Sequence, residues 1–599
     1  MWIRGARTAK QGGKCVRSKP VSRQKKKKQN SGTLTRRSAL ALTGLGGTLA
    51  ACGKTPPTAR EDDAKNGFFR HGVASGDPLQ TRVILWTAIT TDGLPASIIA
   101  EVSTDANFAN IIWSDPVQIR PQFTVNGIIP LKTEAVNLNP GTDYFYRFRE
   151  KGGEISPIGR TKTLVDGPLD ELTMAIVSCS NHPAGYFHSY RHIAQSDPVD
   201  VVVHLGDYIY EYGPGGFATG DAEALDRVPE PPYECISLDD YRRRYAQYHS
   251  DPDLQAAHVV APWIITWDDH ESANDSWKGG AQNHQREDGD WSLREAASLS
   301  AFYEWTPTRE PAEGEPRTAF WREFSFGDLA TLTMLETRLS ARSEQVDWKL
   351  FPVPADADPE DAGVKAKVAS FVNDLVGDSK RRMLGDKQGD FVQDSLKRSV
   401  ESGQPWQLLG NQVLLAKINS PDYIAVLPGW LKWLAKKKQP LLFEYFLRSR
   451  FRPPLNIDAW DGYPAARERL YTRTRRAGSS FISIAGDTHD FNASILRAED
   501  GQVVGAELGT TGVSSPGNFA DVVAPGVDFG RLTEKANPDT ILHDVHHTGY
   551  IRLILRPDEA VADFVSTSSV KQPEFTTSVD SRFRLTPAQN GQPVEIKKV

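Results

Sequence analysis

The segment spanning residues 199–210, Val-Asp-Val-Val-Val-His-Leu-Gly-Asp-Tyr-Ile-Tyr, most strongly constrains the fold. A continuous apolar run of this kind is typical of a strand that is buried on both faces of a sheet. The run stops at Gly206, and a carboxylate, Asp207, and a phenol, Tyr210, follow it. Open α/β sheets bind ligands at the carboxyl ends of such strands. The turn therefore predicts either an oxygen-rich site for a ferric ion and a second hard metal, or an ordinary turn capped by an aspartate.

Three further apolar runs end in residues of the types that bind metals. They are residues 174–181 (MAIVSCSN), 263–271 (WIITWDDHE) and 481–490 (FISIAGDTHD). If the adjacent carboxylates of Asp268 and Asp269 are buried, they require a nearby cation, because like charges so close together cannot all stay ionised. Exposed loop acids are the alternative interpretation. The candidate ligands at or near the four strand ends are Cys179, Asn181, Asp207, Tyr210, Asp268, Asp269, Asn274, Asp487 and His489, and His270 follows the aspartate pair.

Length and charge limit the classes of protein to which the chain can belong. A chain of 599 residues is too long for one compact core, so we expect two or more domains. Residues 1–53 hold 13 Lys and Arg and no Asp or Glu, so the remainder carries 57 basic against 76 acidic residues, a net charge of −19. This acidity argues against nucleic acid as a partner and is compatible with bound divalent cations.

The basic N-terminus resembles an export signal. Residues 35–40 (TRRSAL) resemble a twin-arginine signal, and the apolar stretch 39–51 is too short to span a membrane. The sequence around Cys52, Leu-Ala-Ala-Cys-Gly, resembles a lipoprotein cleavage site, although ordinary cleavage after a small residue is the alternative. We therefore expect residues 1–53 to be a signal peptide and the protein to be periplasmic or extracellular. A lipidated Cys52 would attach it to the membrane.

The body of the chain divides by pattern. Residues 54–66 are expected to be a linker, and residues 67–165 carry short β-like runs that predict a small immunoglobulin- or fibronectin-like sandwich. From 170 to 575 strands alternate with helices, which predicts an α/β domain with central sheets flanked by helices. Residues 576–599 are expected to be a C-terminal tail. In the α/β domain we expect strands at 173–178, 199–205, 263–267, 329–335 and 481–485 and helices at 238–248 and 291–305.

The order of the four ligand motifs resembles the alkaline phosphatase D family. Residues 335–338 (LETR), 384–388 (LGDKQ) and 460–463 (WDGY) contribute to the resemblance, which covers most of residues 67–570. It implies an exported, calcium-dependent phosphatase or phosphodiesterase with the fold of calcineurin-like metallophosphoesterases.

The resemblance also implies a set of metal ligands. Cys179, Asp207, Tyr210 and His489 would hold Fe(3+), and Asp207 would bridge to Ca(2+). Asp269 and Asp487 would be further calcium ligands, at positions where the wider superfamily has Asn and His. This replacement makes the site harder and more anionic, which favours calcium over zinc or manganese. Asn181, Asp268 and Asn274 remain open as additional ligands or as supporting residues.

Two residues are candidates to contact the substrate directly. Arg338 is suited to hold a phosphate with both arms of its guanidinium group, and an ion-paired surface arginine is the alternative. The family usually has Leu-Asp-x-Arg here, so Glu336 makes it less certain that residue 336 orients Arg338. His270 is a candidate to protonate the leaving oxygen or to bind a phosphate oxygen.

Three further features have two interpretations each. Cys179 and Cys235 form a disulfide in the default interpretation of an exported protein, or Cys179 binds the metal and Cys235 stays unpaired. The basic, aromatic stretch 428–451 is either an interfacial helix at a lipid surface or an insertion that packs its tryptophans inward. The histidines of segment 543–547 either line the pocket or lie in a solvated loop.

We therefore predict a secreted, monomeric phosphoric ester hydrolase that acts on phosphate esters. The alternative is a phosphodiesterase acting on phospholipids, teichoic-acid-like polymers or nucleotides. A non-catalytic surface lipoprotein is a minor alternative, which would require broken ligand motifs.

Overall fold

The fold is described from a computed structural model, in which residues 67–599 are described except 96, 439, 518, 520–525 and 590. The expected signal peptide with Cys52 and the expected linker lie outside the described residues. Within the described part of the chain, no helix is long and apolar enough to cross a membrane.

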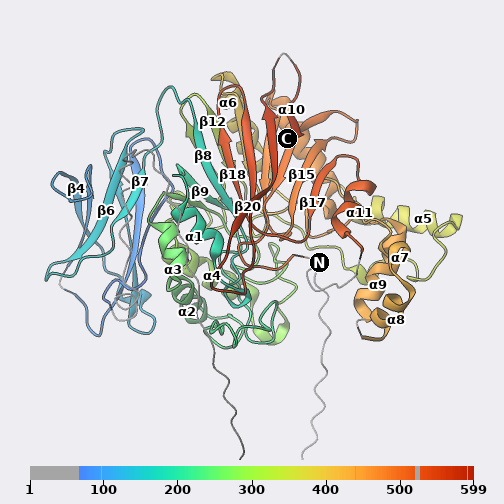
Figure 1. Ribbon diagram of the computed structural model, residues 1–599, viewed down its shortest axis with the longest axis horizontal. Coiled ribbons are helices and arrows are strands. Elements are labelled where there is room, and N and C mark those ends of the chain that lie inside the picture. The colour runs from blue at the N-terminus through green and yellow to red at the C-terminus, as the bar shows by residue number, and fades with distance from the viewer. Residues whose placement is uncertain (1–66, 96, 439, 518, 520–525, 590) are drawn as a thin grey trace, which may run out of the picture. The chain divides into compact units, whose positions relative to one another are not determined.

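The segments containing Cys179, Asp207 and Asp268 follow neighbouring strands of one large sheet. This ten-stranded sheet has the order β21-β20-β19-β18-β8-β9-β10-β1-β2-β5, and β8, β9 and β10 are parallel (Figure 1). Its strands are β1 Val73–Gly76, β2 Arg82–Thr90, β5 Ile128–Val136, β8 Leu172–Val177, β9 Val201–His204, β10 Trp263–Ile265, β18 Thr548–Leu555, β19 Ala560–Thr567, β20 Thr577–Thr586 and β21 Glu595–Lys598.

A second sheet carries the segment of Asp487 and His489. It has seven strands in the order β11-β12-β13-β14-β16-β15-β17, with β12, β13, β14 and β16 parallel to their neighbours in this run. Its strands are β11 Arg322–Phe326, β12 Ala330–Met334, β13 Trp406–Gly410, β14 Phe481–Ala485, β15 Phe491–Arg497, β16 Val503–Gly509 and β17 Thr540–Asp544.

The two sheets share a core because their strands alternate their side chains between two faces. In β8, Met174 and Ile176 pack with Leu332, Leu408 and other residues of the second sheet, whereas Ala175 and Val177 face the opposite core. Fully buried strands of this kind explain the unbroken apolar runs in the sequence. The expected strands and the α/β class are confirmed.

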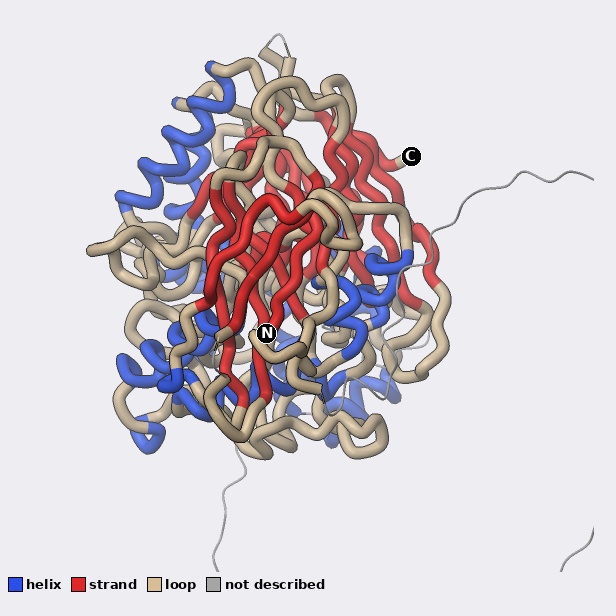
Figure 2. Tube along the Cα trace, turned by 90° about the vertical axis from the view of Figure 1, so that its left-hand side faces the viewer, coloured by secondary structure: helices blue, strands red, loops and turns tan. Residues whose placement is uncertain are grey.

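Helices cover the outer faces of both sheets. α1, α2, α3 and α4 contribute to the core outside the ten-stranded sheet, and α6 and α10 to the core outside the seven-stranded sheet, so strands lie between helical layers (Figure 2). α2 begins after Ser237, which forms a reciprocal capping box with Asp240. The helices are α1 His188–Gln195, α2 Leu238–His249, α3 Pro252–His258, α4 Trp291–Trp305, α5 Ala362–Ser370, α6 Asp386–Glu401, α7 Tyr423–Val426, α8 Gly429–Lys438, α9 Pro440–Arg448, α10 Pro464–Arg476 and α11 Phe529–Ala536.

The predicted N-terminal sandwich is present, but it is not a separate unit. A four-stranded sheet, β4-β3-β6-β7, packs on β1, β2 and β5, and these three strands continue the ten-stranded sheet through the pairing of Gly76 with Trp263. A Cβ atom on Gly76 would lie 2.5 Å from the carbonyl oxygens of Trp263 and Pro307, so this junction requires glycine. The four strands are β3 Ile98–Ser103, β4 Ile111–Val117, β6 Asp143–Glu150 and β7 Gly159–Lys162.

The expected C-terminal tail, residues 576–599, is wrong. β20 and β21 extend the ten-stranded sheet, and Phe583, Leu585 and Ile596 are buried in the core between the two sheets. The alternation of buried and exposed residues from 581 to 586 (SRFRLT) is the signal of a half-buried strand that the tail assignment missed.

Because the C-terminal strands are part of the core, a substitution of a buried residue there should strongly lower the free energy of unfolding. Phe583 is 0% exposed, so Phe583→Ala is expected to lower the free energy of unfolding by about 3–5 kcal/mol. The neighbouring Arg584 side chain is 60% exposed in a surface ion pair, so Arg584→Ala should cost less than about 1 kcal/mol. Denaturant unfolding of both variants tests the difference, and equal small effects would show that the segment is peripheral.

Candidate metal centre

The four ligand segments meet because two sheets bring their strand ends together. Parallel strands β8, β9 and β10 deliver their following loops to one edge, and the loop after β14 approaches from the other sheet. Gly486 makes this approach possible, since a Cβ atom there would lie 2.2 Å from Ser178 Oγ.

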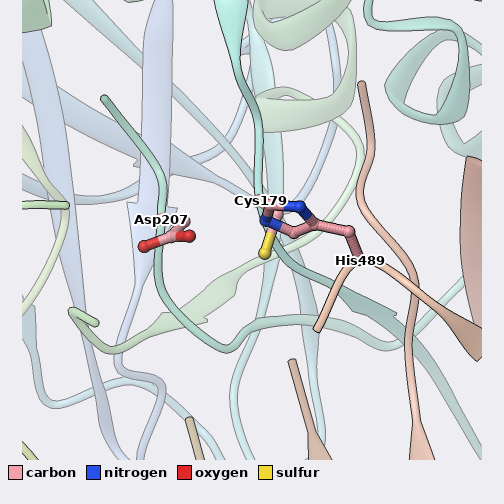
Figure 3. A group of neighbouring side chains, drawn as sticks. All are labelled: Cys179, Asp207 and His489. Carbon is pink, nitrogen blue, oxygen red and sulfur yellow. The ribbon is translucent and has the colours of Figure 1, made fainter. Parts of the chain in front are cut away.

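Cys179, Asp207 and His489 form the first ligand cluster. One ligand atom from each lies within 4.8 Å of the others, all three residues are buried, and Figure 3 shows their side chains converging. Tyr210 completes the group: its hydroxyl donates to Asp207 Oδ2 at 2.9 Å and lies 3.0 Å from His489 Nε2. Sulfur, nitrogen, carboxylate and phenol donors therefore surround one point.

Four of the candidate ligands share an uncommon backbone conformation. Cys179, Asp207, Asp487 and His489 all have positive φ angles, of 60°, 56°, 64° and 58°. Non-glycine residues seldom adopt this conformation, and its occurrence at functional sites reflects support from the surrounding structure. Here the Cys179 N–H donates to Gly206 O and the Ser180 N–H donates to Asp207 O, so the first two ligand loops hold each other.

The contacts of His489 define its protonation state. Its Nδ1 lies 3.0 Å from the carbonyl oxygen of Pro516, which can only accept a hydrogen bond, so Nδ1 carries the proton and Nε2 offers a lone pair to the site. Burial lowers the pKa of His489 to about 4, which keeps the ring neutral at physiological pH. A neutral imidazole held by a backbone carbonyl is the usual form of a metal-binding histidine.

Two further clusters continue from the first. Asp207, Asp269 and His270 offer atoms within 4.8 Å of one another, and so do Asp268, Asp269 and Asp487. Asp207 and Asp269 each belong to two clusters, so the three form one continuous row of ligands. The third cluster contains carboxylates alone, which suits a hard cation such as calcium.

Arg338 lies inside the acidic cluster and is fully buried. Its guanidinium group donates to both carboxylate oxygens of Asp268, to Asp458 Oδ2 at 2.7 Å and to Asp487 Oδ1 at 3.1 Å. The alternative of a surface arginine is therefore wrong. In this arrangement the group balances buried negative charge, and its predicted contact with phosphate stays a prediction.

Glu336 holds the loop that carries Arg338. Its carboxylate accepts hydrogen bonds from the backbone N–H groups of Arg338 and two following residues, at 2.7–2.8 Å, and from Trp267 Nε1 at 3.0 Å. The side chain therefore positions Arg338 through the backbone and not through the guanidinium group. Glutamate at this position is compatible with an ordered loop.

His270 is linked to the ligands on several sides. Its Nδ1 lies 2.7 Å from Glu211 Oε2, and its ring stacks on Tyr210 with a centroid separation of 4.3 Å. Burial lowers the pKa of His270, but Asp269, Glu211 and Asp207 outweigh this effect and hold it well above its ordinary value. The histidine can therefore carry a proton beside the ligand row.

The two asparagines differ in their surroundings. Asn181 is buried, and its Oδ1 has no hydrogen-bond partner among the described residues. An orphaned buried acceptor two residues from Cys179 is compatible with a cation or a bound phosphate hydroxyl. Asn274 instead accepts from Tyr212 at 2.8 Å and donates to Gln282 at 2.6 Å, so it belongs to a protein hydrogen-bond network.

The alternatives for the cysteines and for the 543–547 histidines are resolved. Cys179 and Cys235 are both free, so the disulfide is wrong, and Cys235 donates its Sγ–H to Asp240 O at 3.6 Å. His543 is buried in β17, with Nε2 3.1 Å from Asp490 Oδ2, and lies outside the ligand row. His546 and His547 are exposed in the loop after β17, so the solvated-loop interpretation is correct for these two.

Three supporting acids were missed in the sequence. Glu271 accepts hydrogen bonds from the backbone N–H groups of Asp207, Tyr208 and Asp268, and Glu211 accepts from Asn274 N–H at 3.0 Å. Asp458 binds Arg338 and Arg342, two residues before the Trp460 motif. Glu271 is the last residue of the predicted 263–271 ligand segment, whereas position near a recognised motif was the only signal for Glu211 and Asp458.

The pKa shifts show that the site is deficient in positive charge. Burial raises the pKa of Asp268 to about 8 and that of Asp487 to about 7, and it raises the pKa of Asp207 well above its ordinary value. Asp269 is held below its ordinary pKa, because Arg338 and His270 outweigh the effect of burial there, and Arg338 and Arg342 likewise lower the pKa of Asp458. The residues present therefore fit bound cations, which would allow the remaining carboxylates to ionise.

Comparison with known proteins shows that a protein with this fold and site is a phosphoric ester hydrolase. The chain belongs to the PhoD-like phosphatase family: residues 174–564 match the PhoD-like phosphatase domain and residues 54–165 match its N-terminal domain. It is 30% identical to alkaline phosphatase D of Bacillus subtilis (strain 168) over 548 residues, 87% of this chain and 82% of the relative. A solved structure of PhoD superposes with a TM-score of 0.70 at 30% identity, covering 89% of this chain and 92% of that one.

The raised pKa values predict how cations change stability with pH. A carboxyl group whose pKa is raised by folding favours the folded state at low pH and loses this contribution as the pH rises through its folded pKa. For Asp268 and Asp487 the loss extends to pH values of about 7 to 8 in the cation-free protein. We expect the difference in Tm between calcium-loaded and chelated protein to increase from about pH 5 to about pH 8. A difference that is constant or decreases over this range, measured by calorimetry, would contradict the interpretation.

Proposed function

We propose that the protein is an exported alkaline phosphatase that hydrolyses phosphate esters at a centre of Fe(3+) and Ca(2+). The continuous row of ligands that shares Asp207 and Asp269 is the observation that carries this proposal. Family membership supports the phosphatase activity. The export signal, the lipidation of Cys52 and the monomeric state remain parts of the proposal that rest on the sequence.

The donor set supports a highly charged ion at the first cluster. Burial and the neighbouring Asp207 raise the pKa of both Cys179 and Tyr210 well above their ordinary values. These groups would therefore become thiolate and phenolate only beside a strong positive charge, which Fe(3+) provides. Asp207 would bridge to calcium, and Asp269 and Asp487, with Asp268, would supply further hard oxygen ligands.

The protein's own groups would position and protonate the substrate. When bound, the ions would supply Lewis-acid polarisation of the phosphoryl oxygens and a lowered pKa for a nucleophilic oxygen. His270, fixed at Nδ1 by Glu211, would donate a proton from Nε2 to the leaving oxygen. Arg338 would bind the phosphate by exchanging one of its present bonds, such as that to Asp487.

Metal analysis and kinetics of ligand variants, with a matched cysteine control, test whether these residues hold the metals. Cys179→Ala and Tyr210→Phe are expected to lose iron and to lower kcat by about 100-fold or more, because each removes a charged ligand. Cys235→Ala is the matched control, since Cys235 is an equally buried free thiol away from the ligand row. Asp487→Asn should lose calcium more readily than iron. Full activity after a calcium chelator, in protein that contains neither metal, would overturn the proposal.

The sequence left a phosphodiesterase as the alternative, and substrate comparison separates the two. We expect p-nitrophenyl phosphate to be hydrolysed with a higher kcat/KM than bis(p-nitrophenyl) phosphate, because the ligand row can accommodate a doubly charged phosphate monoester. The reverse order would assign the site to diesters. A non-catalytic lipoprotein is disfavoured, because the ligand segments are all present and converge.

A further inference from the structure

Helix α8 presents tryptophans to solvent. Trp430 is 57% exposed, Trp433 61% and Leu434 37%. Positions 430, 433, 434 and 437 recur at helical spacing and therefore lie on one face of α8. The expectation that this insertion packs its tryptophans inward is wrong for both of them.

The exposure does not result from a loosely attached helix. α7, α8 and α9 lie side by side (Figure 1), and they share a hydrophobic cluster that includes Tyr423, Leu427 and Phe446. On α8 itself, Leu431 packs against this cluster and Ala435 is buried. The inner face of the helix is thus anchored, which leaves the tryptophan face as a defined outer surface.

The same helix is strongly basic within an acidic protein. It carries Lys432, Lys436, Lys437 and Lys438 and no acidic residue, whereas residues 54–599 together carry 57 basic and 76 acidic side chains. Among the described residues, none of these lysines forms an ion pair with a carboxylate. Lys437 Nζ lies 4.7 Å from the ring centroid of Trp433, so aromatic and cationic groups are interleaved.

We propose that the face of α8 formed by Trp430, Trp433, Leu434 and Lys437, flanked by the other lysines of the helix, binds the surface of a bilayer that contains anionic phospholipid. Indole rings favour the boundary between headgroups and acyl chains, and lysines keep their charge at the headgroups while their methylene stems lie against apolar surface. Complementary charge selects anionic lipid. A protein partner is less favoured, because the cores of protein interfaces are depleted in lysine. With 10 residues, α8 lies on a bilayer and does not span it.

Hydrogen exchange on the full chain tests this surface directly. Cys52→Ser removes the site of lipid attachment in every sample. We expect vesicles of phosphatidylcholine with phosphatidylglycerol to slow exchange in peptides from residues 426–438, and vesicles of phosphatidylcholine alone to have little effect. A local readout is needed because the basic residues of segment 1–53 can also bind anionic vesicles. Unchanged exchange in residues 426–438, even if the chain sediments with vesicles, would overturn the proposal.

Matched variants provide the second measurement. Trp430→Ala combined with Trp433→Ala should abolish the protection of α8 and lower its apparent vesicle affinity about tenfold or more, with kcat for p-nitrophenyl phosphate unchanged. Lys436→Ala, Lys437→Ala and Lys438→Ala together should remove the preference for anionic lipid. Leu293→Ala, at an exposed leucine of α4 that is 71% accessible, is the apolar control and should have no effect. Equal protection by neutral vesicles, or tryptophan-dependent dimerisation in light scattering without vesicle protection, would overturn the assignment.

Discussion

The candidate metal centre buries more carboxylates than the nearby basic side chains can neutralise, and the rest of the site depends on this excess of negative charge. Asp207, Asp268, Asp269 and Asp487 converge where two sheets meet, and Arg338 is the fully buried base among them. Uncompensated charge at such depth is strongly unfavourable, so the arrangement is stable only with protonation, ion pairing or bound cations. The strained ligand backbones and the supporting hydrogen bonds all serve to hold these acids in place.

Aspartates and glutamates have different roles in this arrangement. The aspartates provide the candidate ligands, whereas Glu271 and Glu336 accept backbone N–H groups from the ligand loops and Glu211 accepts from His270 and Asn274. A longer side chain can reach across to a neighbouring loop, while a shorter one keeps its carboxylate near its own strand end. Glu271 and Glu211 thereby link loops that lie far apart in the sequence, and Glu336 does so only through Trp267 Nε1. Removing any of the three would leave buried N–H groups without acceptors.

The outer surface of α8 differs from the core in that it combines exposed apolar side chains with positive charge. Its inner residues are held by the same aromatic cluster that contains Phe519 and Phe529, so the helix is part of the folded body. Its outer residues combine large apolar groups with positive charge, although the surrounding protein is acidic. An exposed patch of this composition is costly in water unless a surface of matching chemistry covers it.

The sequence alone determined the buried strands and the types of ligand that follow them, because an apolar run and its boundary are local properties of the chain. For this reason the α/β class could be predicted, and the resemblance to a known family implied that Cys179, Asp207, Asp269, Asp487 and His489 belong to one site. Only the tertiary structure decided that Asp458 binds Arg338, that Glu336 accepts a hydrogen bond from Trp267, and that residues 577–598 complete a sheet. It also decided which face of α8 is exposed. These features depend on contacts between residues far apart in the sequence, and the pattern of one segment does not specify the partner that another segment brings to it.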